Sequence, residues 1–173
     1  YKIMNKKLMM AMLAAGSVLT MTNALAAAGT VNFNGNILDS ACDVDVASQN
    51  QVVVLGDYYK TEFPTTGART AATQFNIILK NCPVTVTNAK VRFDGTPDLT
   101  NTSLLAIDTS VAGAATGVAI NLMTADKADL PLHGSNSYTY ALSSTADNTL
   151  SFYAQYISTA ASVTAGPANS VAN

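Results

Sequence analysis

The sequence predicts an all-β domain, and two observations lead to this prediction. Apolar residues recur at every second position in several short runs, whereas helical periodicity is nearly absent. Clusters of Gly, Pro, Asn, Asp and Ser separate these runs at short intervals, as expected for turns between strands. Several short strands at regular spacing are typical of a β-sandwich, which is the architecture that we expect.

Seven stretches are expected to form the strands of this sandwich. Each is short and carries alternating, β-branched or aromatic residues, and the stretches are residues 30–38, 51–55, 74–80, 90–94, 117–124, 137–142 and 149–157. Residues 63–67 and 95–98 contain the Pro and Gly of turns, and residues 125–131 would join two strands. A chain of 173 residues allows one such domain and little else.

Residues 1–26 are expected to be a signal peptide. Lys6 and Lys7 form a short positive region, and an apolar stretch follows them. Ala24 and Ala26 then place small residues at the two positions that a signal peptidase recognises. A buried N-terminal helix is the alternative interpretation. The apolar stretch is shorter than the roughly 20 residues of a transmembrane helix, so no membrane span is expected in the mature chain.

Removal of the leader would make the protein acidic. Residues 1–3 precede Met4 and are expected to be read-through from upstream of the true start. Cleavage after Ala26 would leave 147 residues, which keep six of the nine basic residues and all eleven acidic ones, for a net charge of −5. Proteins that bind nucleic acid carry clustered Lys and Arg, so nucleic acid is not an expected partner. An acidic surface instead keeps copies apart until a specific contact forms.

The two cysteines, Cys42 and Cys82, are expected to form a disulfide. A signal peptide directs the protein to an oxidising compartment, where an even number of cysteines indicates a bridge, and two free thiols are the alternative. A closed loop of about 40 residues would stabilise the fold by roughly 4 kcal/mol in the chain-entropy model. A metal site is not expected, because the single histidine, His133, has no Cys or carboxylate at ligand spacing.

Neither an enzyme nor a cofactor site is expected. The single histidine excludes most acid–base arrangements, and no G-x-S-x-G motif is present, so no catalytic residue is assigned. Asp39, Asp43 and Asp45 form an acidic cluster but lack the glycine and terminal glutamate of a calcium loop. We expect Asp43 and Asp45 to share the solvent-facing side of one strand. Tyr58 and Tyr59 are expected to be structural residues at a strand edge rather than a sugar platform.

The segment 27–39, ahead of the first cysteine, is the strongest candidate for function. Its apolar face would carry Val31, Phe33, Gly35 and Ile37. Asn34-Gly35 is a two-residue hairpin signal, and spacing alone favours a hairpin. The alternative is one continuous strand, in which the glycine marks a place where another chain approaches closely.

The order of motifs resembles the subunits of chaperone–usher type 1 fimbriae, the pilins, and in particular their major subunits. The resemblance covers essentially the whole mature chain. It rests on T-V-x-F-x-G-x-I at 30–37, Cys42, Val54-Leu55-Gly56, Phe63 and Gly67, F-N-I-I-L-K-N-C at 75–82, F-D-G at 93–95, G-V-A-I-N-L at 117–122, F-Y-A-Q-Y at 152–156 and V-T-A-G-P-A-N at 163–169.

This resemblance implies a mechanism of assembly. Pilins are immunoglobulin-like sandwiches that lack their final strand, and a donor strand from a chaperone or a neighbouring subunit completes them. Residues 27–39 would then be the donor-strand extension, and residues 40–173 the pilin sandwich. Val31, Phe33, Gly35 and Ile37, joined by Gly29, would enter the neighbour's groove. Burial of three apolar side chains would stabilise the contact by on the order of 5–9 kcal/mol before ordering costs.

The implied partners are neighbouring pilin subunits in a homopolymer, a periplasmic chaperone and an outer-membrane usher. The implied location is an extracellular fimbrium on a bacterial surface, reached through the periplasm, where it would support cell adhesion. Two departures from the pilin pattern leave alternatives open. The family usually ends in a further strand, so we expect the domain to be truncated at Asn173. The extension before Cys42 is short, as in minor or adaptor subunits. A lectin-like adhesin module is a further alternative to a structural subunit.

Overall fold

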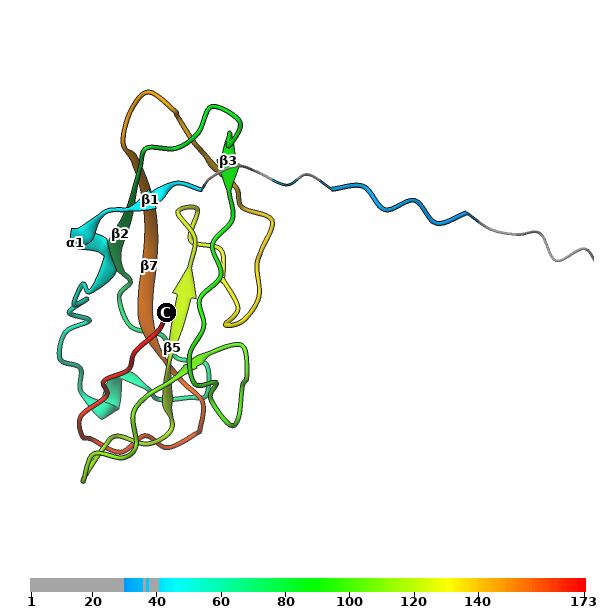
Figure 1. The fold of residues 1–173 in the computed structure, drawn as a ribbon. Helices are drawn as coiled ribbons and strands as arrows, with labels where there is room; N and C mark the ends of the chain where they lie inside the picture. Colours follow the sequence, from blue (N-terminus) through cyan, green and yellow to red (C-terminus); the bar gives the residue numbers. More distant parts are fainter. Residues whose placement is uncertain (1–29, 36, 38–40) are drawn as a thin grey trace, which may run out of the picture. The chain divides into compact units, whose positions relative to one another are not determined.

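The computed structural model describes residues 30–35, 37 and 41–173 (Figure 1). The chain divides into two units, residues 1–36 and residues 37–173. The described residues of the first unit, 30–35, belong to no helix or strand. The predicted cleavage residues Ala24 and Ala26, and the predicted donor residue Gly29, lie outside the described residues, so the leader and its cleavage stay predictions.

The regular secondary structure in the described part of the second unit is mostly strand, with little helix, as predicted (Figure 1). Its strands are β1 (Asp43–Val44), β2 (Thr73–Lys80), β3 (Asn88–Ala89), β4 (Leu105–Ala106), β5 (Val118–Met123), β6 (Tyr140–Ala141) and β7 (Asn148–Ser158). The helical segments are α1 (Val46–Gln49) and the 3₁₀ turn η1 (Lys60–Glu62).

The strands form two sheets that enclose the core. One sheet has five strands in the order β1-β2-β7-β5-β4, and every neighbouring pair in it is antiparallel. The other is the antiparallel pair of β3 and β6. The long strand β7 lies at the centre of the larger sheet, between β2 and β5. Its register places Phe152 opposite Phe75 and Tyr156 opposite Ile120, so the apolar faces of three strands coincide.

An aromatic cluster fills the space between the two sheets. Phe152 on β7 is completely buried, and its ring lies 5.5 Å from Phe75, 5.2 Å from Phe93 and 5.1 Å from Tyr140 between ring centroids. Offset-stacked and edge-on pairs of this kind contribute about 0.5–1.5 kcal/mol each beyond the burial of their area. The alternation of apolar residues in β2 and β7 therefore defines the inner face of the sandwich.

Three predicted strands are confirmed and three are wrong or shorter. Residues 74–80, 117–124 and 149–157 correspond to β2, β5 and β7. Residues 51–55 and 90–94 form no strand, and the stretch 137–142 is reduced to β6. The reason is physical, because a strand requires a partner for its backbone groups, whereas alternation requires only one buried side. Residues 51–55 have a partly buried side but no partner strand.

The stretch 30–38 is also not a strand where it is described. Residues 30–35 and Ile37 have no strand assignment. Asn36 and residues 38–40 lie outside the described residues, so the hairpin hypothesis for Asn34-Gly35 stays a prediction.

The predicted disulfide is present and joins Cys42, just before β1, to Cys82, just beyond β2. The expectation that Asp43 and Asp45 share the face of one strand is wrong. Strand β1 ends at Val44, and Asp45 caps α1 by accepting a 3.0 Å hydrogen bond from the backbone N–H of Ala47. Its carboxylate also lies 2.7 Å from the Lys80 ammonium, which lowers the pKa of Asp45. Asp39 lies outside the described residues.

Candidate functional site: an open apolar groove

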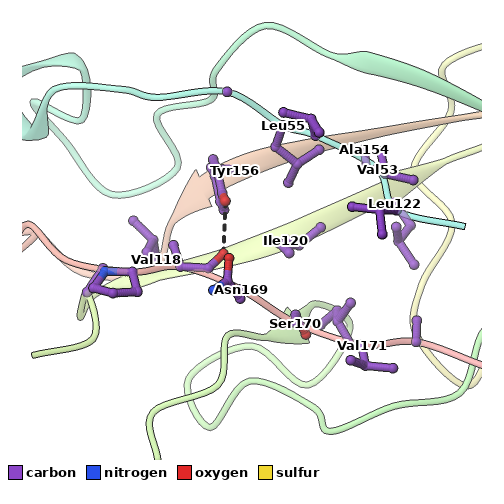
Figure 2. Close-up of a pocket in the computed structure, with 18 of the residues that line it drawn as sticks. Val53, Leu55, Val118, Ile120, Leu122, Ala154, Tyr156, Asn169, Ser170 and Val171 are labelled. Carbon is purple, nitrogen blue, oxygen red and sulfur yellow. Dashed lines mark hydrogen bonds between the residues drawn. The ribbon is translucent and has the colours of Figure 1, made fainter. Parts of the chain in front are cut away.

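A long groove of about 1050 Å³ runs over one face of the larger sheet (Figure 2). Residues 48–58 form one of its walls, and residues 163–173 form the other. Strands β5 and β7 supply most of the floor between them. The groove therefore lies where a sandwich would carry a further strand, between two segments that do not pair with each other.

The floor of the groove is apolar and regular. Val118, Ile120 and Leu122 of β5 point into it in a row, and Ala154 and Tyr156 of β7 lie beside them (Figure 2). Val118, Ile120 and Leu122 are only 6–7% exposed. These residues are two positions apart, so the floor repeats with the period of an extended strand.

The first wall is extended but unpaired. Residues 52–55 all line the groove, but Val53 and Leu55 are half-buried, whereas Val52 and Val54, which alternate with them, are 88% and 76% exposed. Among the described residues, no backbone–backbone hydrogen bond involves any residue of 51–57. This wall thus has the side-chain alternation of a strand together with free backbone N–H and C=O groups.

The backbone–backbone hydrogen bonds of the second wall lie on its outer side. The C=O of Asn169 accepts a 2.7 Å hydrogen bond from the N–H of Asp108, and Asn173 exchanges two backbone hydrogen bonds with Asp94. The alternate residues Ala168, Ser170 and Ala172 make no backbone–backbone hydrogen bond to any described residue. Because backbone groups alternate in direction along an extended segment, this wall also has a free edge.

Tyr156 crosses the floor and connects it to the second wall. Its hydroxyl donates a 2.8 Å hydrogen bond to the C=O of Ala168, drawn as the dashed line in Figure 2. The ring of Tyr58, from the opposite wall, packs edge-on against it with centroids 6.1 Å apart. Burial raises the pKa of Tyr156, so its hydroxyl stays protonated and remains a donor at neutral pH. Tyr58 is thus a structural residue, as expected, although it lies in no strand.

The groove has the two requirements for binding an extended peptide. Free backbone groups on both walls can bond the main chain of an added strand, and the apolar floor can bury every second side chain. An unfilled groove of this kind also promotes aggregation.

The predicted donor residues that are described have the complementary character. Val31, Phe33 and Ile37 are 73%, 92% and 101% exposed. A side chain built on Gly35 would meet nothing within 4 Å. None of the residues that line the groove was predicted as a site residue. The alternation in 51–55 and 117–124 was the available signal for them, but it was interpreted only as strand structure.

Residues 31–173 match the sequence model of the family described as "Fimbrial protein". The chain belongs to this family. It is 37% identical over 162 residues to the type 1 fimbrial subunit of Klebsiella pneumoniae, covering 88% of each chain. It is 38% identical over 143 residues to a type-1 fimbrial protein A chain of Escherichia coli, covering 82% of this chain and 77% of that one.

Solved structures of fimbrial proteins have the same fold. A type I fimbria protein and antigen of Burkholderia pseudomallei superposes with a TM-score of 0.59 at 36% identity, over 83% of this chain and 93% of that one. A subunit of a chaperone–usher pilus gives a TM-score of 0.62 at 27% identity, over 86% and 93% of the two chains. The domain is thus an incomplete immunoglobulin-like sandwich, and the protein is a structural fimbrial subunit.

Two further properties concern only the part of the protein that the structure describes. Its helices are too short to cross a membrane. Its His, Cys, Asp and Glu side chains form no group of three that could hold a metal ion.

Proposed function

We propose that this protein polymerises by donor-strand exchange to form a bacterial surface fimbria that supports cell adhesion. Residues 27–39 of one copy would provide a strand that fills the groove of the next copy. The observation that carries this proposal is the groove itself, which has an apolar floor between two unpaired backbone edges.

The dimensions of the two partners support the proposal. Residues 31–37 would span roughly 23 Å as a strand, as would the equally long wall segment 51–57. Val31, Phe33, Gly35 and Ile37 would face the floor, where Val118, Ile120 and Leu122 repeat with the same period. The inserted strand would thus bond both walls along its length.

The energetics also favour a stable contact. Burying Val31, Phe33 and Ile37 contributes on the order of 5–9 kcal/mol before ordering costs. Each main-chain hydrogen bond to a wall adds about 0.5–1.5 kcal/mol net. Because the extension and the groove are different surfaces, the contact is heterologous, and its repetition generates a filament rather than a closed dimer.

Transport to the surface would require that the groove never stay empty. The leader would direct the protein to the periplasm. There a chaperone would lend a strand, and at the outer-membrane usher the extension of the incoming subunit would replace it. The similarity to a chaperone–usher pilus subunit supports both partners.

The first experiment tests the extension. Full-length wild type, Gly35→Arg and the matched control Asn34→Arg are expressed with the cognate chaperone and usher, and the cells are imaged by electron microscopy. Gly35 would face the floor and Asn34 the solvent, because neighbouring side chains of a strand alternate. We expect fibres for wild type and Asn34→Arg, and none for Gly35→Arg despite periplasmic accumulation of the subunit.

The second experiment tests the groove with another matched pair. Val53→Asp places a carboxylate on the floor side of the first wall, whereas Val54→Asp changes a side chain that is already 76% exposed. We expect Val53→Asp to abolish fibres and Val54→Asp to retain them. Equal fibre formation by both members of each pair would refute the donor-strand proposal and favour a hairpin at Asn34-Gly35.

A further inference from the structure

A second pocket, of about 290 Å³, lies on the opposite face of the larger sheet. Asn121 of β5 and Ile157 of β7 line it, and they alternate with the groove residues Ile120 and Tyr156. Side chains that alternate along a strand point to opposite faces, so the pocket is separate from the groove.

The floor of this pocket combines apolar and polar groups. Leu104 and Ile157, which are 5% and 7% exposed, form with Ala119 a small apolar cluster distinct from the main core. Asn121 lies beside them with only 3% exposure. The pocket therefore offers a compact apolar surface next to a buried amide.

An ion pair of fixed geometry borders the pocket. The two terminal nitrogens of Arg69 donate hydrogen bonds of 2.9 and 3.0 Å to the two carboxylate oxygens of Asp129, and the amide of Asn121 donates one of 2.8 Å. β-Bridges hold both backbones, Arg69 against Ile157 and Asp129 against Met123. These contacts preorganise the border, which lowers the entropy cost of binding a ligand.

The opposite border has donors that the fold does not use. The backbone N–H groups of Thr100 and Asn101 donate to the carboxylate of Asp98, and that of Ser103 donates to the amide oxygen Oδ1 of Asn101, which fixes this loop. The Ser103 hydroxyl, the Nδ2 amide group of Asn101 and the Arg69 Nε–H, however, make no hydrogen bond with any described residue. All three belong to residues that line the pocket.

We propose that this pocket binds a neutral, hydroxyl-rich ring the size of one monosaccharide. Arg69 and Asp129 neutralise each other, so the border favours neither an anion nor a cation. Hydroxyl groups both donate and accept, and can therefore match the free donors and the carboxylate together. The apolar floor of Leu104 and Ile157 would contact the C–H face of the ring. The volume lies at the small end of ligand pockets, which suits a single ring.

The test uses saturation-transfer NMR to detect binding to the mature protein, as fibre or soluble subunit. The probes are the methyl glycosides of mannose, glucose, galactose and N-acetylglucosamine. We expect transfer from at least one glycoside, with a dissociation constant in the millimolar range. Ser103→Ala should weaken that binding about threefold, since it removes one neutral hydrogen bond. Ser103→Trp, which fills the pocket, should abolish it, and Thr102→Trp, one residue outside the lining, should leave it unchanged.

Two results would overturn the proposal. One is an absence of transfer from every glycoside to the folded wild-type protein. The other is equal binding by Ser103→Trp and Thr102→Trp, which would place the glycoside elsewhere. If no glycoside binds and Ser103→Trp alone changes the fibre in electron micrographs, the pocket is a contact between subunits and the monosaccharide proposal is wrong. Because both tryptophan variants leave the groove and residues 31–37 intact, this test does not depend on the donor-strand proposal.

Discussion

The hydroxyl of Tyr156 donates a 2.8 Å hydrogen bond to the carbonyl oxygen of Ala168 and thereby connects the floor of the groove to its second wall. Tyr156 belongs to the long central strand β7, whereas Ala168 belongs to a segment outside any strand. The backbone of that segment is bonded on its outer side, for example to Asp108 and Asp94. The phenol of Tyr156 thus links the floor to the second wall from the groove side, in addition to the bonds that hold this wall on its outer side.

Tyr156→Phe removes this bond while keeping the ring. We expect it to lower the free energy of unfolding by about 0.5–1.5 kcal/mol, the net contribution of one hydrogen bond. The control is Tyr59→Phe, which alters a ring that is 80% exposed and should change stability little. Urea unfolding of the mature subunit measures both. Equal stability of the two variants would mean that the bond does not hold the second wall.

Gly117→Ala should be far more destabilising than Gly67→Ala. Both glycines have positive φ, +76° and +87°, so alanine costs about 1–2 kcal/mol at either position. At Gly117 the added carbon would also lie 2.6 Å from the backbone oxygen of Ser162, whereas at Gly67 it meets nothing within 4 Å. We expect thermal unfolding to show at least about 1 kcal/mol more destabilisation for Gly117→Ala. A similar loss in both variants would contradict the close approach.

Removal of the disulfide should destabilise the domain by about 2–5 kcal/mol, as in other small secreted domains. The double variant Cys42→Ala/Cys82→Ala should accumulate poorly in the periplasm and unfold at lower urea than wild type. Dithiothreitol should lower the midpoint of wild type to that of the double variant and leave the double variant unchanged. Any effect of the reductant on the double variant would show that it acts elsewhere.

The ion pair of Arg69 and Asp129 should make the free energy of unfolding depend on pH in the acidic range. The hydrogen bond from Arg69 lowers the pKa of Asp129 below its value in the unfolded state, which is about 3.9. The stabilisation is therefore present above that pH and is lost as the pH falls through the folded-state value.

At pH 7, Asp129→Asn should cost about 0.2–1 kcal/mol, because both side chains are partly exposed. It should also lose less stability than wild type between pH 5 and pH 2. Arg69→Gln should behave in the same way, and the double variant should add little, as expected for two residues of one pair. Parallel pH profiles for wild type and Asp129→Asn would exclude this contribution.

The sequence predicted the parts of the fold that depend on local pattern. The alternating apolar residues of β2, β5 and β7 predicted these strands from the sequence. In the structure, these residues face the core around Phe152. The same alternation occurs in residues 51–55, which were predicted as a strand and are not one. Alternation indicates a partly buried side, whereas a strand also needs a backbone neighbour, and residues 51–55 have no such neighbour among the described residues.

The groove was less predictable from local pattern than the disulfide. Two cysteines in a secreted protein indicate a pair, and the bridge between Cys42 and Cys82 is confirmed. The contact between Tyr156 and Ala168 joins a strand to a segment beyond the next turn, and no local motif indicates it. The approach of Arg69 to Asp129, 60 residues apart, likewise depends on the tertiary fold.

The position of the disulfide has a mechanical consequence for a fibre. In the sequence, Cys42 stands between the proposed donor residues 31–37 and the groove wall 51–57. Its bond to Cys82 attaches this point covalently to the end of β2, and β1 and the ion pair of Asp45 and Lys80 reinforce the attachment. A tensile load on the extension would therefore pass into the central sheet before it reached the wall. In the proposed fibre, the groove of a subunit under tension would then keep its shape and retain the donor strand of the neighbouring subunit.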